Sequence, residues 1–70
     1  MTTQEKIGLN IQRLRREKGL TQAAVASEAG INTNTYAKIE RGVQTATIPM
    51  LEKIAEVLGV KLDTLFVFED

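Results

Sequence analysis

The sequence predicts an all-α domain of five short helices, and three observations support this class. Apolar residues recur three and four positions apart, which gives a helix one apolar face. Glycines stand where several such segments end, the usual place for a helix stop. Hydrophobic residues make up 43% of the chain and charged residues 26%, the balance of a folded protein. We therefore expect residues 1–70 to form one domain, ordered almost throughout.

The first helix is predicted from Thr2 to Lys18. Thr2 and Glu5 stand in the order of an N-terminal capping box, in which each side chain bonds to the backbone N–H of the other residue. Gly19 ends the helix. The residues of its apolar face are Ile7, Ile11 and Leu14.

The second helix is predicted at residues 22–29, and the third runs from an Asn32 cap to about Arg41. Thr21 can cap the second helix, because its hydroxyl can accept a bond from a backbone N–H of the first turn. Small residues in the second helix allow a neighbouring helix to come close: Ala23, Ala24, Ala26 and Ala29. The inward side chains of the third helix are Tyr36 and Ile39, and its stop is Gly42.

The fourth helix is predicted between a Thr47 cap and Gly59, with Pro49 tolerated in its first turn. Its apolar face consists of Ile48, Leu51, Ile54, Ala55 and Leu58. Residues 60–66 are predicted as a last short helix, weakly capped because Lys61 occupies the cap position.

Composition excludes several kinds of chemistry. Without cysteine the chain can form neither a disulfide nor a thiolate metal site, and without histidine no nucleophile and base pair stands out. We expect no enzyme activity, metal, cofactor or small-molecule ligand. No apolar run is long enough to span a bilayer and no signal-peptide pattern begins the chain, so we expect a cytoplasmic protein with no membrane partner.

Charge is balanced overall, with nine Lys and Arg residues against nine Asp and Glu residues. Nucleic-acid-binding domains are often strongly basic, so any DNA binding depends on where these charges lie. One basic face can bind phosphate while the acidic residues lie elsewhere. The candidates for that face are Arg13, Arg16, Lys38 and Arg41, and the acidic residues expected elsewhere are Glu28, Glu52, Glu56, Glu69 and Asp70.

Residues 21–42 form the informative stretch: a short helix, a tight turn at residues 30–31, and a second short helix. Such a pair can place its second helix in the major groove of DNA. Gly30 suits the turn, because a side chain would strain that backbone, and Ala26 keeps the two helices close. The alternative is an ordinary helical hairpin, and any one of these residues taken alone would favour it.

Six segments together carry a family resemblance: Gly19-Leu20-Thr21-Gln22, Val25-Ala26, Ala29-Gly30-Ile31, Ile39-Glu40-Arg41-Gly42, Leu51-Glu52-Lys53-Ile54-Ala55 and Leu58-Gly59-Val60. With these segments the chain resembles the Cro and repressor type of helix-turn-helix, the XRE family, without a gap over roughly residues 7–66. Its size and layout are also similar to those of restriction-modification controller proteins and small phage repressors. The resemblance implies a lambda-repressor-like fold and a transcriptional regulator that binds double-stranded DNA.

The resemblance also assigns roles to residues. Gln22, Arg41 and the backbone of Gln44 and Thr45 match positions that contact DNA phosphates, where contacts fix register without reading sequence. Gln22 would also brace the recognition helix, and a solvated polar residue is the alternative for it. The base-reading positions would be Asn32, Thr33, Asn34, Ala37 and Lys38. Asn34 suits adenine, Lys38 suits guanine, and Ala37 suits a thymine methyl group. The alternative for this helix face is a solvated polar surface, and capping alone would explain Asn32.

Two further expectations concern architecture and affinity. Arg15 and Glu40 match positions that form a partly buried ion pair in similar repressors, and two separate surface charges are the alternative. Residues 43–46 are uncharged where many family members have Lys or Arg. We therefore expect modest phosphate affinity for each subunit.

A single recognition helix and an uncharged loop favour a symmetric homodimer on a palindromic operator. The interface is expected in the C-terminal part, at Met50, Val57, Leu62, Leu65 and Phe68, with Phe66 in the core. The alternative is that the tail folds back over its own core. The competing function is a protein-interaction module of the same fold, such as an antitoxin or a bridging factor.

Overall fold

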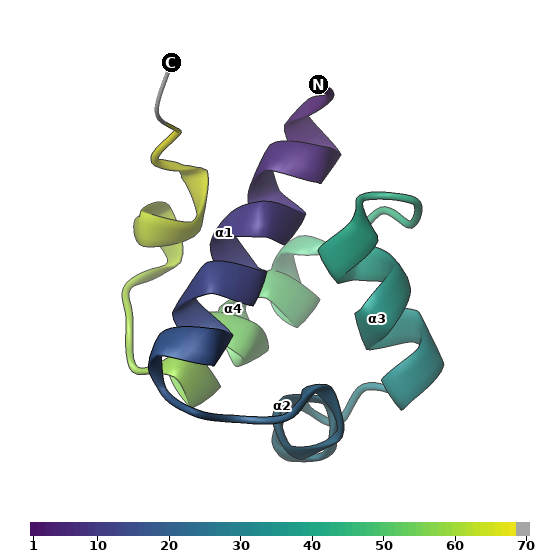
Figure 1. Ribbon diagram of the computed structural model, residues 1–70, viewed down its shortest axis with the longest axis vertical. Helices are drawn as coiled ribbons and strands as arrows, with labels where there is room; N and C mark the ends of the chain where they lie inside the picture. The colour runs from purple at the N-terminus through teal and green to yellow at the C-terminus, as the bar shows by residue number, and fades with distance from the viewer. Residues whose placement is uncertain (69–70) are drawn as a thin grey trace.

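The computed structural model describes residues 1–68, and these form four α-helices and one 3-10 segment (Figure 1). In chain order the elements are α1 (Thr3–Glu17), α2 (Gln22–Ala29), α3 (Thr33–Arg41), α4 (Ile48–Leu58) and η1 (Leu62–Phe66). The all-α class is confirmed. The predicted fifth helix is instead a 3-10 segment, because it is short and its Lys61 cap position supplies no side-chain hydrogen bond. Glu69 and Asp70, expected away from the basic face, lie outside the described residues.

The predicted helix starts are confirmed by their hydrogen bonds. Thr2 Oγ1 accepts from the Glu5 N–H at 3.1 Å, and the Thr2 N–H donates to Glu5 Oε1 at 2.8 Å, which completes the capping box. Thr21 Oγ1 accepts from the backbone N–H of the third residue of its helix at 3.0 Å. Asn32 Oδ1 accepts from the Asn34 N–H at 2.9 Å and also from the next N–H at 3.3 Å. These bonds fix where each helix begins, as sequence patterning indicated.

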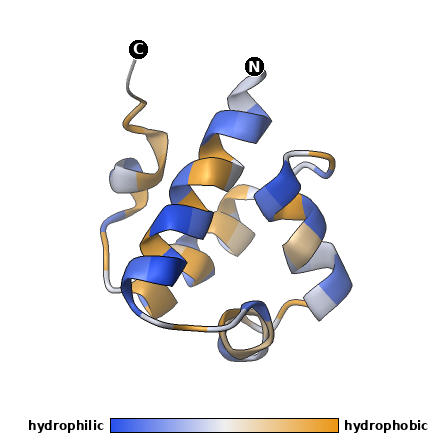
Figure 2. Ribbon diagram, viewed as in Figure 1, coloured by the Kyte–Doolittle hydropathy of each residue, from blue (hydrophilic) through white to orange (hydrophobic). Residues whose placement is uncertain are grey.

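The core lies where α1, α2, α3, α4 and η1 meet. Figure 1 shows α1 running between α3 on one side and the C-terminal segment on the other. Figure 2 shows that α4 is largely hydrophobic, whereas most of α3 is hydrophilic or near neutral. The completely buried large side chains are Ile11, Val25, Tyr36, Ile54, Leu58 and Leu65.

No helix in residues 1–68 has both the length and the apolar character needed to cross a membrane.

The backbones of α1 and α3 touch at Gly8. A Cβ atom built on Gly8 would lie 2.5 Å from the Ile39 carbonyl oxygen and would also overlap the Glu40 carbonyl oxygen. No side chain fits between the two helices at this point. Gly8 therefore sets the distance between α1 and α3, a role that the sequence analysis did not assign.

The C-terminal segment folds back over the core, the arrangement expected as the alternative to a C-terminal interface. The Asn10 Nδ2 atom donates to the carbonyl oxygens of Leu65 and Val67, both at 2.9 Å. Leu65 is 0% exposed, so its prediction as an interface residue is wrong: it faces inward from η1. Phe66, predicted in the core, is 37% exposed. In a 3-10 segment side chains three positions apart lie above one another, so Leu62 and Leu65 share the side that packs on the core and Phe66 lies off it.

The remaining predicted interface residues lie at the edge of the core. Met50, Val57 and Leu62 are half-buried and pack against it. Phe68 is also half-buried, with the Lys6 Nζ atom 5.6 Å from its ring centroid. Each of these side chains keeps part of its surface exposed.

Candidate nucleic-acid interface

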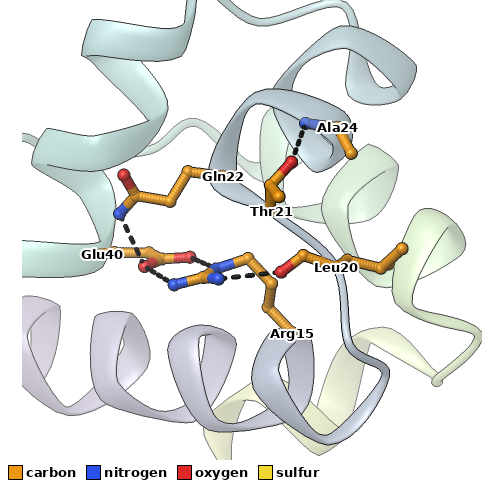
Figure 3. Close-up of polar contacts among 6 residues, drawn as sticks. All are labelled: Arg15, Leu20, Thr21, Gln22, Ala24 and Glu40. Atoms are coloured by element: carbon orange, nitrogen blue, oxygen red, sulfur yellow. Dashed lines mark hydrogen bonds and ion pairs between the residues drawn. The ribbon is translucent and has the colours of Figure 1, made fainter.

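A buried ion pair joins the end of α3 to α1 (Figure 3). Arg15 donates from Nε to Glu40 Oε2 at 2.7 Å and from Nη2 to Glu40 Oε1 at 3.1 Å. Arg15 also donates from Nη1 to the Leu20 carbonyl oxygen at 2.9 Å. The Glu40 side chain is 0% exposed and that of Arg15 is 11% exposed. The structure thus places the two predicted partners in a two-pronged contact, the geometry that fixes a guanidinium most firmly.

Gln22 completes this cluster from the first residue of α2. Its Nε2 atom donates to Glu40 Oε1 at 3.0 Å, and its amide oxygen lies on the side away from Glu40 (Figure 3). Gln22 is half-buried, so part of its amide reaches the surface. The cluster of Arg15, Glu40 and Gln22 therefore ties α1, α2 and α3 together at one point.

The pKa values of the pair follow from this geometry. Burial alone would raise the pKa of Glu40, but hydrogen bonds from Arg15 and Gln22 outweigh it and hold that pKa below its ordinary value. The hydrogen bond to Glu40 raises the pKa of Arg15. Both side chains are therefore charged at neutral pH.

Tyr36 lies against this cluster from within α3. The residue is 0% exposed, and its hydroxyl has no hydrogen-bond partner among the described residues. Burial raises the pKa of this phenol above its ordinary value, so Tyr36 is a neutral core residue.

The opposite face of α3 is exposed and carries no acidic side chain. Tyr36, Ile39 and Glu40 are buried, which leaves the rest of the helix surface to the predicted base-reading positions. Thr33, Asn34 and Lys38 are exposed, together with Arg41 at the helix end, and Ala37 is half-buried between them. The only acid in α3, Glu40, points inward. This face is therefore polar and basic. Asn32 precedes it, with its side-chain oxygen occupied in capping.

The segment between α3 and α4 continues the exposed face. Gly42 has a φ of 74°, and a Cβ there would lie 2.5 Å from the Cα of Glu5, so only glycine fits. The backbone N–H groups of Gln44 and Thr45 donate to no backbone oxygen within residues 1–68. Unpaired N–H groups at the surface are suited to bind anions such as phosphate. Two residues of the stretch 42–46 are exposed, Val43 and Thr45. The apolar Val43 is 69% exposed.

The two exposed arginines of α1 line one hollow, together with Gln12 and Glu17. Arg13 pairs with Glu17 at 3.3 Å and lines a hollow with Val67 and Phe68. It is two residues from Arg15, roughly 160° around the helix, and so faces the C-terminal segment instead of α3. Arg16 is exposed, one turn beyond Gln12, which lines another hollow with Arg41. Gln12 therefore lies next to both Arg16 and Arg41, whereas Arg13 also lies next to the C-terminal segment.

Acidic residues of α2 stay clear of this surface. Glu28, the only acid in α2, lies six positions after Gln22, roughly 120° around the helix. Glu28 thus lies on a different side of α2 from Gln22, and α3 exposes no acid. Glu5 of α1 lies nearer, because it lines a hollow with Arg41. Exposed positive charge is still present on α3 although the net charge of the chain is zero.

Sequence reasoning missed three contacts that hold this surface in place: Gly8 against α3, Gly42 against Glu5, and the Gln4 side chain against Thr45. A glycine in the middle of an amphipathic helix lowers helix stability by about 1 kcal/mol relative to alanine. Its presence at position 8 therefore indicated that another backbone comes close there. The other two contacts join residues about forty positions apart, and the sequence contains no local signal for them.

The short α2, the turn at Gly30 and the exposed face of α3 define a helix-turn-helix domain. Residues 11–65 match the helix-turn-helix family, and the chain belongs to this family. Its relatives are transcriptional regulators and not enzymes. The resemblance seen in the sequence is thereby confirmed.

Two relatives illustrate this membership. Over 60 residues the chain is 40% identical to y4dJ, an uncharacterized HTH-type transcriptional regulator of Sinorhizobium fredii, covering 86% of this chain and 78% of y4dJ. It is also 40% identical over 60 residues to the HTH-type transcriptional regulator SinR of Bacillus subtilis, covering 84% of this chain. That match covers 54% of SinR, so the chain spans about half the length of that relative.

Solved structures of helix-turn-helix proteins have the same fold as this chain. The restriction-modification controller protein C.AhdI from Aeromonas hydrophila superposes with a TM-score of 0.88 and 28% identity, covering 90% of this chain and 96% of that chain. SinR in its crystal structure with DNA superposes with a TM-score of 0.82 and 37% identity, covering 87% of this chain and 98% of that chain.

Proposed function

We propose that this protein binds specific sequences in double-stranded DNA as a dimeric transcriptional regulator. The observation that carries the proposal is the exposed, acid-free face of α3, held from behind by the buried cluster of Arg15, Glu40 and Gln22. A rigid helix with polar and basic side chains on its outer face suits the major groove. SinR, a relative with the same fold, has been crystallised with DNA.

Base reading falls to the middle of the exposed α3 face. Asn34 can pair with adenine through two hydrogen bonds, Lys38 can donate to guanine, and Ala37 can contact a thymine methyl group. Thr33 stands at the start of the same face and can bond to either kind of base edge. Asn32 contributes as the cap that fixes the helix start, since its side-chain oxygen is occupied there.

Phosphate contacts surround this face. Gln22 can use the part of its amide that Glu40 leaves free, while Arg41 and Arg16 supply exposed positive charges. Gln44 and Thr45 can offer their unpaired backbone N–H groups. These contacts would hold the helix in register and add affinity that does not depend on sequence.

A homodimer would supply the second half-site that one helix of nine residues needs. Met50 and Val57 lie two turns apart on one face of α4, half-buried, and Leu62 and Phe68 are also only partly covered. Val67 is 64% exposed, and it lines one hollow with the adjacent Phe68. These partly exposed apolar side chains are where we expect the contact between subunits, because exposed apolar surface on a small domain often marks an interface. A symmetric dimer would recognise a palindromic operator.

Selection of a preferred site from a random double-stranded DNA pool tests the proposal. Enriched sequences with two inverted half-sites about one helical turn apart are the expected result. Mobility-shift assays with excess nonspecific DNA then measure how much more tightly the selected site binds. A pool in which no sequence is enriched would contradict the proposal and favour a protein-interaction module such as an antitoxin or bridging factor.

A further inference from the structure

One hydrogen bond at the edge of the candidate interface has no role in the function proposed above. The Gln4 Nε2 atom, in the first turn of α1, donates to Thr45 Oγ1 at 2.6 Å. Both residues are exposed, and 41 positions of sequence separate them. A bond between two exposed side chains is easily exchanged for water, so it persists only where the backbone already holds the two residues together.

The first turn of α1 provides that support. Glu5, the neighbour of Gln4, lies close to Gly42: a Cβ atom added to Gly42 would be 2.5 Å from the Glu5 Cα. The capping box with Thr2 fixes the same turn. In the segment that joins α3 to α4, Gly42 thus contacts Glu5 and Thr45 contacts Gln4, and these two partners are neighbours in α1.

The Thr45 side chain is not packed into the core. A mainly apolar hollow of about 200 Å³ opens beside it, lined by Ile7, Leu51 and Phe66 together with Gln4 and Thr45. Ala46, the next residue, packs against the core and holds the backbone there. Within the described residues the bond from Gln4 is therefore the side-chain contact that orients the Thr45 hydroxyl.

The direction of the bond determines what Thr45 can do. A threonine hydroxyl has one hydrogen to donate and two lone pairs that accept. Gln4 occupies a lone pair, and no residue in the described part of the chain accepts the hydroxyl hydrogen. The hydroxyl hydrogen therefore points away from the Gln4 nitrogen, next to the unpaired backbone N–H of Thr45.

We propose that Gln4 is a positioning residue for DNA binding, which turns the Thr45 hydroxyl outward as a hydrogen-bond donor to a DNA phosphate. Phosphate oxygens only accept hydrogen bonds, so an oriented donor is what the site requires. The N-terminal turn of α1 thereby becomes part of the DNA-contacting apparatus, although Gln4 itself need not touch DNA. The inference rests on the proposed function.

The test is a double-mutant cycle on affinity for the selected DNA site. Gln4→Ala and Thr45→Val are each expected to weaken binding about three- to tenfold, alike for selected and nonspecific DNA. The double variant should bind no more weakly than Thr45→Val alone, because Gln4 acts through the hydroxyl. In a Thr45→Ser background, which keeps the hydroxyl, Gln4→Ala should again weaken binding.

Two controls separate this role from a general loss of structure. Thr3→Ala changes an exposed neighbour of Gln4 that forms no side-chain hydrogen bond within residues 1–68, and it should leave affinity unchanged. The thermal midpoint of Gln4→Ala should stay at the wild-type value, since the residue is exposed. The slope of affinity against salt should also be unchanged, because a neutral side chain releases no counterions.

The outcomes distinguish the inference from the proposed function. If wild type prefers its selected site and Gln4→Ala binds as tightly, the positioning role is overturned and DNA binding stands. Equal losses from Gln4→Ala in the wild-type and Thr45→Val backgrounds would also overturn it, because Gln4 would then act without the hydroxyl. Absence of any preferred site for wild type overturns both.

Discussion

Arg15 and Glu40 face each other across the α1–α3 contact with two parallel hydrogen bonds, at 2.7 Å and 3.1 Å. Because the pair is buried, removing one partner leaves a charge that no water can reach. We expect Arg15→Met or Glu40→Gln to lower the free energy of unfolding by about 3–5 kcal/mol, measured by urea denaturation. In the double variant the two losses should not add. Additive losses would mean that the residues do not interact.

The lowered pKa of Glu40 predicts how stability depends on pH. The carboxylate is favoured in the folded state, so its contribution is fully present above the unfolded pKa of about 4.5 and is lost as pH falls through the lower folded pKa. Glu5 has a lowered pKa through its bonds to Thr2 and adds to the same acid range. The difference in stability between wild type and Glu40→Gln should therefore shrink below pH 4.5. A difference that stays constant from pH 7 to pH 3 would contradict this assignment.

Gly8→Ala should destabilise the protein, although alanine favours helices by about 1 kcal/mol over glycine. The added Cβ would collide with the Ile39 and Glu40 carbonyl oxygens and push α1 from α3. We expect a net loss of about 1–3 kcal/mol in unfolding free energy and weaker binding to the selected DNA site. Ser27→Ala, at an exposed position of α2, is a control expected to have little effect. Higher stability of Gly8→Ala would disprove the close contact.

Lys38→Ala and Arg41→Ala should affect DNA binding in different ways. Lys38 lies in the middle of the exposed α3 face, so its loss should cost about 1–3 kcal/mol at particular base pairs and relax selectivity there. Arg41, at the helix end, should weaken all sequences alike and lower the salt slope by about 1. Affinities for single-base variants of the operator, measured at several salt concentrations, check both. Identical losses on every sequence for the two variants would refute this division of roles.

The dimer is tested by a matched pair of valines. Val67 is 64% exposed in the proposed interface, and Val43 is 69% exposed in the segment between α3 and α4. An aspartate at Val67, or at Phe68, should shift the protein towards monomer in sedimentation at micromolar concentration and weaken binding to a palindromic site, because a buried charge opposes association. Val43→Asp should leave the oligomeric state unchanged. If wild type sediments only as a monomer and Phe68→Asp binds the palindrome as well as wild type, the dimer model fails.

Much of the fold depends on local signals that the sequence displays. Thr2, Thr21, Asn32 and Thr47 cap the helices as predicted, because a capping bond joins residues two or three positions apart. The exposed face of α3 also follows from sequence, since helical periodicity alone separates Asn34 and Lys38 from the buried Tyr36. The family resemblance rests on the same local patterns.

The tertiary structure decided what periodicity leaves open. The hollow that Arg13 shares with Val67 and Phe68 depends on how the C-terminal segment packs beside α1. Leu65 is buried and Phe66 is partly exposed because of how η1 packs against α1 and α4. Gly8, Gln4 and Thr45 acquire their roles from partners more than thirty positions away. The sequence by itself therefore determined each helix and its outer face, since those follow from interactions within a few residues. Long-range contacts depend on how the helices pack, and only the folded chain brings such partners within bonding distance.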